Sequence, residues 1–368
     1  MSGKPSLLTP GCLALLTLTA CAGQEPTETQ IDDAAGARVS IMTFNVENLF
    51  DNRDDPGKDD KTFLPLAAKQ AAAHKAECAT ITVERWRTQC FDWDWSDAMV
   101  ERKLAAVAGA ILQVNDGRGP DIVALQEIEN LGILERLRTE YLADADYGPA
   151  ILIEGHDRRG IDVAFLSRLK LAEPAKLHKP EFPGVERARR DDTRGILEAT
   201  FVLPDGSLLT GFAVHFPAPF HPTPMRETAY EHLNTLKAAL PPGRPVFAAG
   251  DFNTTSAEDR AEDMLARYVR PDWIVAHEIG CADCRGTSYF APRDDWSFLD
   301  MILWSPGDTR GEHATWRLRG ETILIPNRAP GQTRPDGTPW RFEMPGGTGV
   351  SDHWPMLITI ESLKNKEL

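Results

Sequence analysis

Short apolar runs alternate with polar segments along the chain, and most of these runs have the length of a β-strand. The pattern predicts strands over residues 39–44, 121–126, 161–166, 195–203, 207–215, 246–249, 298–304 and 354–360. Apolar residues three and four positions apart predict a helix from Asp97 that ends before Asn115, and helices over 133–142, 227–240 and 257–268. Some of these strands are joined by helices and one pair by a hairpin turn at Pro204-Asp205-Gly206, with no internal repeat. The pattern favours an α/β (α+β) domain in which helices cover two sheets.

Residues 51–96 interrupt this pattern of strands and helices. The segment begins with a charged stretch, Asp51 to Lys61, and contains Trp86, Trp93 and Trp95 together with two cysteines. We therefore expect an insertion at the edge of a domain that spans residues 38–362.

The first 20 residues have the features of an export signal. Lys4 precedes the apolar run Leu13 to Leu18, and small residues follow, which is typical of a secretory signal and too short to span a bilayer. Leu18-Thr19-Ala20-Cys21 resembles a bacterial lipobox, which predicts lipidation of Cys21 after removal of residues 1–20. Ordinary cleavage near Ala20 or Ala22 is the alternative. Residues 21–37 are small and polar and predict a tether, so we expect an exported protein that is lipid-anchored in the bacterial envelope, at the outer membrane or the periplasmic face.

Export changes the interpretation of the cysteines, because disulfides form in oxidising compartments. Six cysteines are present, and two of them belong to the export signal. The other four predict the disulfides Cys78–Cys90 and Cys281–Cys284, although spacing does not fix the connectivity. A zinc site at His277, Cys281 and Cys284 is an alternative that lacks an evident fourth ligand. A redox-active Cys-x-x-Cys is a further alternative.

The charge of the chain limits the classes of substrate. The chain has 368 residues, 42% of them apolar, and a formal net charge of −15. A chain this acidic does not attract polyanions at long range. If the substrate is nucleic acid, a local basic groove or a metal ion must offset the negative field.

Polar residues recur where the predicted strands end. Asp251 and Asn253 follow one strand at a spacing that projects both side chains the same way. Both are also common turn residues, and Asp300 and Asp162 within strands are compatible with buried, hydrogen-bonded carboxylates. Ligands of open α/β sheets gather at strand ends, so the repeated occurrence favours one shared site. The residues at strand ends are Asn45, Glu127, His215, Asp251, Asn253, Asp352 and His353.

Seven short motifs occur in order: Phe44-Asn45-Val46-Glu47-Asn48-Leu49, Leu125-Gln126-Glu127, Gly160-Ile161-Asp162-Val163-Ala164, Val214-His215-Phe216, Gly250-Asp251-Phe252-Asn253, Leu299-Asp300 and Ser351-Asp352-His353. Together they resemble the endonuclease/exonuclease/phosphatase superfamily, over about residues 39–360. The superfamily includes deoxyribonuclease I-like nucleases, abasic-site endonucleases, inositol polyphosphate phosphatases and bacterial sphingomyelinases. The resemblance implies a four-layer sandwich, with two mixed β-sheets packed face to face between helices. It also implies hydrolysis of phosphate esters with a divalent metal.

The resemblance also implies a metal site. Glu127 matches the principal metal ligand, Asn45 a neighbouring ligand or a partner of metal-bound water, and Asp352 completes the metal neighbourhood. Oxygen donors of this kind suit Mg²⁺, with Mn²⁺ as a substitute.

The remaining roles follow from the same resemblance. His353 and Asp251 are jointly assigned the activation of the attacking water, with Asp300 orienting the His353 imidazole. Asn253 is expected to orient a phosphate oxygen or the nucleophile. His215 is expected to stabilise the phosphate or assist the leaving group.

Three further residues have weaker assignments. Asp162 is expected to orient a neighbour in the site. Arg194 lies just before a strand and is a candidate for phosphate contact, whereas Arg189 and Arg190 fit a solvated loop.

The substrate stays open between three hypotheses. The first is a nuclease that acts as a monomer on DNA or RNA, and this hypothesis rests on family analogy. The second is a phospholipid or sphingolipid phosphodiesterase, suggested by the envelope location and by tryptophans in predicted loops, although Trp304 and Trp354 fit the core. The third is a binding lipoprotein with a degenerate site, which the complete set of motif residues disfavours.

Overall fold

A computed structural model describes residues 36–307 and 315–363. The predicted signal peptide, the lipidation site Cys21 and the predicted tether up to residue 35 lie outside the described residues. Within the described ranges, no helix combines the length and the hydropathy that crossing a bilayer requires.

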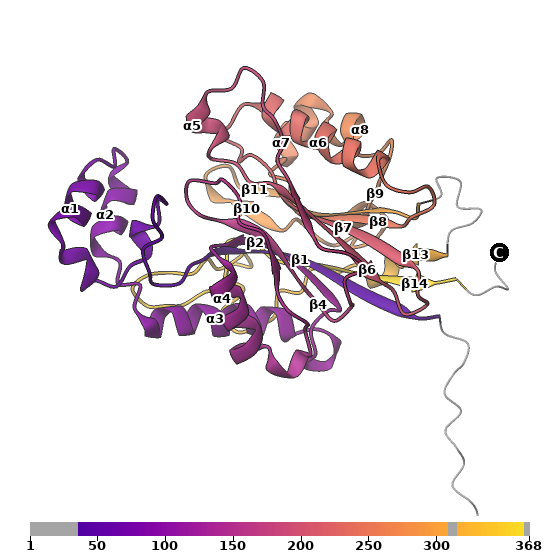
Figure 1. Ribbon diagram of the computed structural model, residues 1–368, viewed down its shortest axis with the longest axis horizontal. Helices are drawn as coiled ribbons and strands as arrows, with labels where there is room; N and C mark the ends of the chain where they lie inside the picture. The colour runs from indigo at the N-terminus through magenta and orange to yellow at the C-terminus, as the bar shows by residue number, and fades with distance from the viewer. Residues whose placement is uncertain (1–35, 308–314, 364–368) are drawn as a thin grey trace, which may run out of the picture. The chain divides into compact units, whose positions relative to one another are not determined.

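Two six-stranded sheets form the centre of the domain (Figure 1). The first sheet has the strand order β13 (Trp316–Leu318), β14 (Met356–Ser362), β1 (Arg38–Leu49), β2 (Ile122–Ile128), β4 (Asp162–Ser167) and β3 (Ile151–Leu152). The second sheet has the order β5 (Lys176–His178), β6 (Ile196–Val202), β7 (Leu208–His215), β8 (Val246–Asp251), β12 (Asp300–Ser305) and β9 (Ile274–Val275). Both sheets are mixed, because β1–β2 and β7–β8 are parallel pairs and the other pairs are antiparallel.

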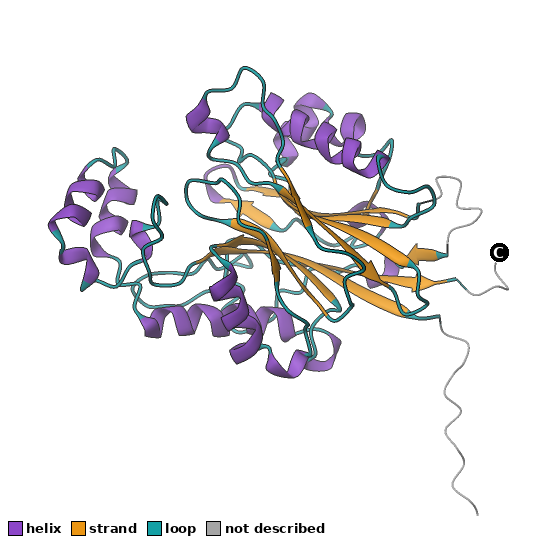
Figure 2. Ribbon diagram, viewed as in Figure 1, coloured by secondary structure: helices purple, strands orange, loops and turns teal. Residues whose placement is uncertain are grey.

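Helices cover the outer faces of the sheets and complete four layers (Figure 2). The first sheet is covered by α3 (Asp97–Leu112) and α4 (Leu131–Arg136), which continues as a π-helical turn (Leu137–Tyr141). The second sheet is covered by α6 (Thr223–Ala238) and α8 (Met264–Tyr268). The shorter elements are α1 (Ala72–Ala79), α2 (Glu84–Asp92), α5 (Arg187–Arg190), α7 (Ser256–Glu262), α9 (Ala276–Ile279) and the hairpin β10 (Ser288–Phe290)–β11 (Asp295–Ser297). The predicted four-layer sandwich is confirmed.

The hydrophobic core follows these layers. Between the sheets, the ring of Phe165 packs edge-on against Phe201 and Phe247, and Trp304 is buried with them. On the outer side of the first sheet, the apolar face of α3 packs against β1 and β2. Burial of these faces provides the main driving force for folding and fixes the positions of the strand ends.

Most predicted elements differ from the observed ones by a few residues at their ends, and two of the differences have a clear local cause. The strand predicted to end at Asn45 continues to Leu49, because a bulge lets β1 resume its pairing with β2. The helix predicted over 257–268 is divided into α7 and α8 by Asp263, which adopts a left-handed conformation at φ 53°.

The predicted insertion forms a separate set of short helices beside the sandwich (Figure 1). Aromatic rings attach it to the domain: Phe63 stacks on Phe50 at 4.0 Å, and Trp95 packs edge-on against Phe63 at 5.3 Å. The indole N–H of Trp95 donates to the Phe50 carbonyl oxygen at 3.1 Å. The insertion is therefore fixed at its base, next to the end of β1.

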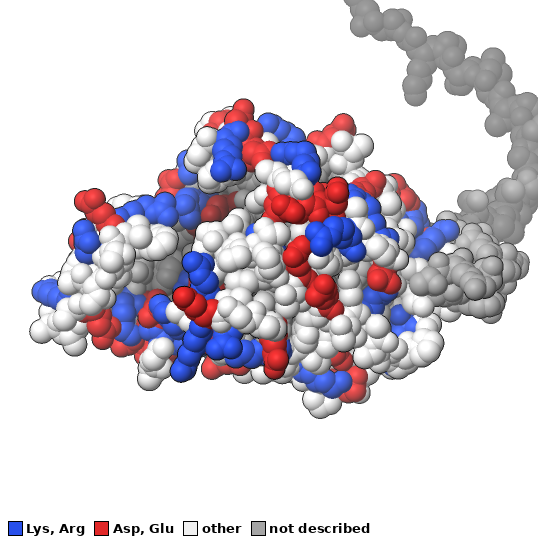
Figure 3. All heavy atoms as spheres, turned by 90° about the horizontal axis from the view of Figure 1, so that it is seen from above, with Lys and Arg blue, Asp and Glu red and all other residues white. Residues whose placement is uncertain are grey.

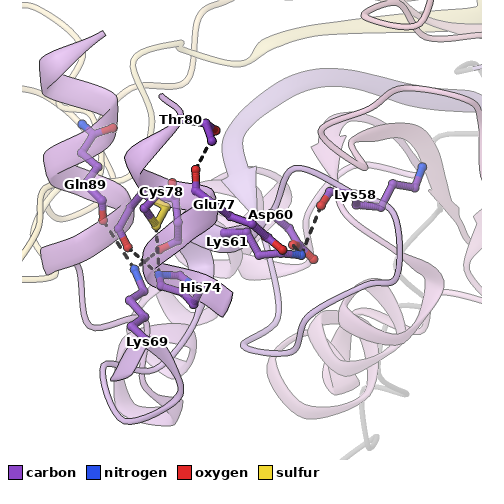
Figure 4. The surroundings of a disulfide bond; sticks show 11 residues. Lys58, Asp60, Lys61, Lys69, His74, Glu77, Cys78, Thr80 and Gln89 are labelled. Carbon is purple, nitrogen blue, oxygen red and sulfur yellow. Dashed lines mark hydrogen bonds and ion pairs between the residues drawn. A yellow bond between two sulfur atoms is a disulfide. The ribbon is translucent and has the colours of Figure 1, made fainter. Parts of the chain in front are cut away.

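Both expected disulfides are present. Cys78–Cys90 links α1 to α2, with the imidazole of His74 beside it, as Figure 4 shows. Cys281–Cys284 closes a short loop after α9. The structure thus supports the connectivity that the spacing left open.

The zinc alternative for the second cysteine pair is wrong. A disulfide leaves no thiolate to bind zinc. His277 stacks on Phe298 at 3.9 Å between ring centroids, and burial lowers the pKa of His277 to about 4. This histidine is a packed core side chain.

Strand direction brings the predicted site to one end of the sandwich. Strands β1, β2, β7 and β8 end there, and β4, β12 and β14 begin there, as their pairing shows. The insertion follows directly after β1, so it borders the same end.

Candidate active site

The pairing of β8 places three predicted residues side by side. Asp251 at the end of β8 lies opposite His215 of β7 and opposite Asp300 of β12. This close strand pairing requires glycine at position 250, because a Cβ there would lie 1.9 Å from the Val214 carbonyl oxygen. The sequence motif around Asp251 therefore combines a steric requirement with a chemical one.

Several site residues have strained backbones. Glu47, Asn48, Glu127 and Asn253 all have φ between 52° and 65°, a region that non-glycine residues seldom adopt. Such strain concentrates at functional sites, where surrounding contacts hold it in place. Here it turns the ends of β1, β2 and β8 so that their polar side chains meet.

His353 forms the centre of the site. Its Nδ1–H donates to Asp300 Oδ2 at 2.7 Å, and ligand atoms of His353, Asp300 and Asp251 lie within 4.8 Å of one another. Burial disfavours the imidazolium, but the attraction of Asp300, Asp251 and Asp352 outweighs it and raises the pKa of His353 well above its ordinary value. Burial and the nearby Asp300, opposed by His353, raise the pKa of Asp251 to about 7. His353 is therefore held in its charged form beside Asp251, whose carboxyl group ionises less readily than an exposed one.

Asn45 connects the two sheets across the site. Its Nδ2–H₂ donates to Asp251 Oδ2 at 3.1 Å and reaches Glu127 Oε1 at 3.5 Å. The backbone N–H of Asn48 donates to Glu127 Oε2 at 2.9 Å and orients that carboxylate. Asn45, Glu127 and Asp251 thus meet at one point, although 206 positions separate Asn45 from Asp251 in the sequence.

His215 and Asn253 lie on the other side of Asp251. His215 Nε2 is 3.6 Å from Asp251 Oδ2, and its buried Nδ1 has no partner in the described structure. Burial, together with the charges of Arg194, Arg159 and His353, lowers the pKa of His215 well below its ordinary value. Asn253 donates to the Phe216 carbonyl oxygen at 3.0 Å and through its backbone N–H to Asp251. A neutral imidazole and a fixed carboxamide therefore border the Asp251 carboxylate.

The donor set fits a divalent cation. Glu127 and Asp352 offer hard carboxylate oxygens, and the Asp352 carboxylate is 44% exposed and so accessible from solvent. Asn45 lies beside Glu127, and its Oδ1 accepts the Glu47 backbone N–H at 3.0 Å. Asp300 Oδ1 is buried without a hydrogen-bond partner, and the carboxylates crowd the centre of the site. An added cation relieves this excess of negative charge.

Sequence reasoning missed the residues that hold Asp352. Glu47 accepts the backbone N–H groups of Asp352 and Phe342 at 3.1 and 3.0 Å, and Arg341 donates to Glu47 Oε1 at 2.8 Å. Arg341 also reaches Asp352 Oδ2 at 3.3 Å. Lys103 on α3 donates to the carbonyl oxygens of residues 46 and 350 at 2.6 and 2.7 Å and clamps the two segments together. The available sequence signals for this network were Glu47 within the first motif and Lys103 on the apolar face of α3.

Arg194 and Asp162 lie outside the central cluster. Arg194 is buried, and its guanidinium donates to Asp157 Oδ2 at 3.3 Å and to the Phe216 carbonyl oxygen at 3.1 Å. Its side chain is only 4% exposed and is paired inside the protein, and the predicted phosphate contact stays a prediction. Asp162 accepts the backbone N–H of Gly155 at 2.9 Å and supports the loop before β4.

The ionisation of Asp162 should make stability depend on pH. Burial raises the pKa of Asp162 to about 7, against about 3.9 in an unfolded chain. The wild type therefore has a proton-linked stabilisation that is fully present below pH 4 and is lost as pH rises through 7. Asp162→Asn keeps an acceptor for Gly155 but cannot ionise. As pH rises from 5 to 8, the wild type should lose about 2–3 kcal/mol of unfolding free energy that the variant keeps, and urea denaturation at each pH measures this difference. The exposed Asp144→Asn is the control, and equal pH profiles for Asp162→Asn and wild type would contradict the assignment.

The sequence of the chain places it in a known family. A sequence model of the Endonuclease/Exonuclease/phosphatase family matches residues 42–353, and the chain belongs to this family. The predicted resemblance is confirmed, and the chain is a phosphoester hydrolase of a class that is typically dependent on a divalent metal. No curated protein matches the chain.

Solved structures share the fold at low identity. Truncated TDP2 from Caenorhabditis elegans has a TM-score of 0.50 and 16% identity, covering 88% of this chain and 98% of its own. A family protein from Bacteroides thetaiotaomicron has a TM-score of 0.53 and 15% identity, covering 89% of this chain and 100% of its own. A family protein from Leptotrichia buccalis has a TM-score of 0.52 and 15% identity, covering 88% and 99%. At these identities the similarity concerns the sandwich fold.

Proposed function

We propose that the protein is a Mg²⁺-dependent phosphodiesterase that acts on nucleic acid outside the cytoplasm. The proposal rests on the convergence of Asn45, Glu127, Asp251, Asp300 and His353 at one end of the sandwich. This set combines oxygen atoms that suit a metal ion with groups for proton transfer, and each can speed the hydrolysis of a phosphodiester at neutral pH.

Each side chain has a separate role in the proposed mechanism. Asp251, whose pKa lies at about 7, accepts the proton of the attacking water. His353, held as a cation by Asp300, donates a hydrogen bond to the phosphoryl oxygen on which negative charge develops. Asn253 is fixed by the Phe216 carbonyl oxygen and orients the phosphate. A divalent ion held by Glu127, Asn45 and Asp352 supplies charge neutralisation when bound.

Exposed aromatic and basic side chains support nucleic acid as the substrate. Phe220 is 72% exposed on the loop that follows β7, and Phe290 is 55% exposed on the β10–β11 hairpin. Ser288 of that hairpin forms a bridge with His353, so the hairpin borders the site. Aromatic rings of this kind stack on bases. Figure 3 shows basic and acidic side chains interspersed over one face of the molecule, so on that face a bound metal ion would have to offset the negative charge.

A lipid phosphodiesterase is the second candidate. The same exposed ring of Phe290, with Arg293 within 5.9 Å of its centroid, is also suited to a lipid headgroup region. A binding lipoprotein with a degenerate site is disfavoured, because the acid–base pair and the oxygen donors are all in place.

A substrate panel separates these functions. The purified mature chain is incubated with Mg²⁺ and plasmid DNA, RNA, sphingomyelin vesicles or bis(p-nitrophenyl) phosphate. We expect cleavage of DNA or RNA together with the generic diester. Cleavage of sphingomyelin alone would establish the lipid function, and the absence of any hydrolysis would reject a phosphodiesterase.

We also propose that Cys21 anchors the mature chain in the envelope. Replacing Cys21 with Ser should move the protein from the membrane fraction to the soluble fraction after cell fractionation, because the acyl chains supply the membrane affinity. Cys12→Ser, within the signal segment, is the control and should stay in the membrane fraction. Retention of the Cys21→Ser protein in the membrane would contradict the lipobox interpretation.

A further inference from the structure

Arg194 is paired inside the protein, and a second arginine lies beside the predicted metal ligand Glu127 with its side chain partly exposed. Arg159 precedes β4, and its guanidinium lies 3.7 Å from Glu127 Oε2 and donates to Asn48 Oδ1. Its side chain is 40% exposed, so it is accessible to a ligand as well as to the site.

We propose that Arg159 binds the phosphate group of the substrate and that the 51–96 insertion holds the loop that carries it. This inference rests on the proposed function for the identity of the ligand. A guanidinium is a fixed cation with a planar set of donors that matches phosphate oxygens in pairs. When a divalent cation occupies the Glu127 carboxylate, it repels Arg159, and the anionic substrate becomes the better partner.

The loop that carries Arg159 is held by hydrogen bonds to a buried carboxylate. The buried Asp157 accepts the backbone N–H of Arg159 at 2.8 Å through Oδ1, and its Oδ2 accepts Arg194 at 3.3 Å. Arg194 thus contributes to the site indirectly, because its buried pair with Asp157 fixes the turn. A preorganised turn reduces the entropy that Arg159 loses on binding a ligand.

The insertion holds the same loop from the outside. Lys58 Nζ donates to the Asp157 carbonyl oxygen at 2.9 Å, and the backbone N–H of Asp59 donates to the Arg158 carbonyl oxygen at 2.8 Å. The Lys58 side chain also packs beside Gly160. In Figure 4, Lys58 points away from the disulfide, while Lys61 turns towards Asp60 and the Lys58 backbone. The insertion therefore holds the Arg159 loop through Lys58 and Asp59, while Lys61 stays within the insertion.

The adjacent Arg158 provides a matched control. It has the same charge and is 58% exposed, but its guanidinium pairs with Asp59, at 2.6 Å, instead of with Glu127. Substituting either arginine changes the net charge equally, so a difference between them reports position and not charge.

The test measures the binding of inorganic phosphate by titration calorimetry in Mg²⁺ buffer, using wild type, Arg159→Gln, Arg159→Lys and Arg158→Gln. We expect Arg159→Gln to weaken phosphate binding about ten- to hundredfold, since it removes a charge-assisted contact. Arg159→Lys keeps the charge without the planar set of donors, so its phosphate affinity should lie between those of the wild type and Arg159→Gln. The phosphate affinity of Arg158→Gln should stay within about twofold of the wild type. Circular dichroism establishes that each variant is folded, and if Arg159→Gln fails to fold, Arg159→Lys decides.

The outcomes distinguish this inference from the proposed function. Equal phosphate affinities for Arg159→Gln and wild type, or no phosphate binding by wild type, would overturn the role of Arg159. If phosphate binding depends on Arg159 but the protein hydrolyses none of the panel substrates, the role of Arg159 is supported and the proposed phosphodiesterase function is rejected.

The role of the insertion has its own readout. With a substrate that the wild type hydrolyses, Lys58→Met should raise KM about threefold at unchanged kcat. The reason is that the Arg159 loop loses a hydrogen bond, whereas His353 and Asp251 are unchanged. An unchanged KM would exclude the insertion from the phosphate site.

Discussion

His353→Ala should reduce kcat for phosphodiester hydrolysis by about 10²–10⁴-fold while the protein stays folded. The imidazole lies beside Asp300 and Asp251, and in the proposed mechanism its charge stabilises the negative charge that develops on the phosphoryl oxygen. Asp251→Asn should cause a loss of the same order, because the carboxamide cannot accept a proton. Measurements of kcat and KM under saturating Mg²⁺ check both, with circular dichroism as the test of folding.

The control for this prediction is His178→Ala. His178 is a partly exposed histidine on β5, at the edge of the second sheet, and it pairs with Glu198 on the neighbouring strand β6. Its removal should leave kcat within about twofold. If His353→Ala retained wild-type activity, the acid–base role would be assigned to the wrong residues.

Glu47→Ala should lower the free energy of unfolding by about 3 kcal/mol or more. The change removes the acceptor for Arg341 and for the backbone N–H groups of Phe342 and Asp352. It also removes the attraction that opposes the burial of Lys103, and burial already lowers the pKa of this lysine to about 8. Chemical denaturation measures the loss, and because Asp352 is displaced, activity should fall with it.

A matched control lies next to Phe342, one of the residues that Glu47 holds. Glu343 is half-exposed and pairs with Arg334 at the surface, where ion pairs contribute little. Glu343→Ala should therefore cost less than about 1 kcal/mol. Equal destabilisation by Glu47→Ala and Glu343→Ala would show that the Glu47 network does not hold the domain together.

The sequence predicted the strands and the residues at their ends well, and the reason is physical. Strands buried on both faces need near-continuous apolar runs, so a polar residue such as Glu127 or Asp251 stands out at the end of one. Chain direction then decides which ends meet, and the order of the motifs supplied that direction. The convergence of Asn45 with Asp251 required the sheet pairing itself, which no local pattern encodes.

The residues that sequence reasoning missed depend on long-range contacts. Glu47 and Arg341 are 294 positions apart. Glu47 lies within the first motif but received no role there, and Arg341 stands in no pattern that distinguishes it from a surface residue. Arg194 and Arg159 have similar sequence contexts before strands, and only the buried partner Asp157 decides that Arg194 is structural. Burial of a charged side chain is a property of the packed structure, and its sequence signal is weak.

The most informative single measurement is the rate of bis(p-nitrophenyl) phosphate hydrolysis by the purified mature chain, first in EDTA and then after Mg²⁺ is restored. We expect no hydrolysis above background in EDTA, full recovery with Mg²⁺, and no recovery in His353→Ala. Undiminished hydrolysis in EDTA, or none with Mg²⁺ or Mn²⁺ on this diester or any substrate of the panel, would contradict a metal-dependent phosphodiesterase built around His353 and Asp251.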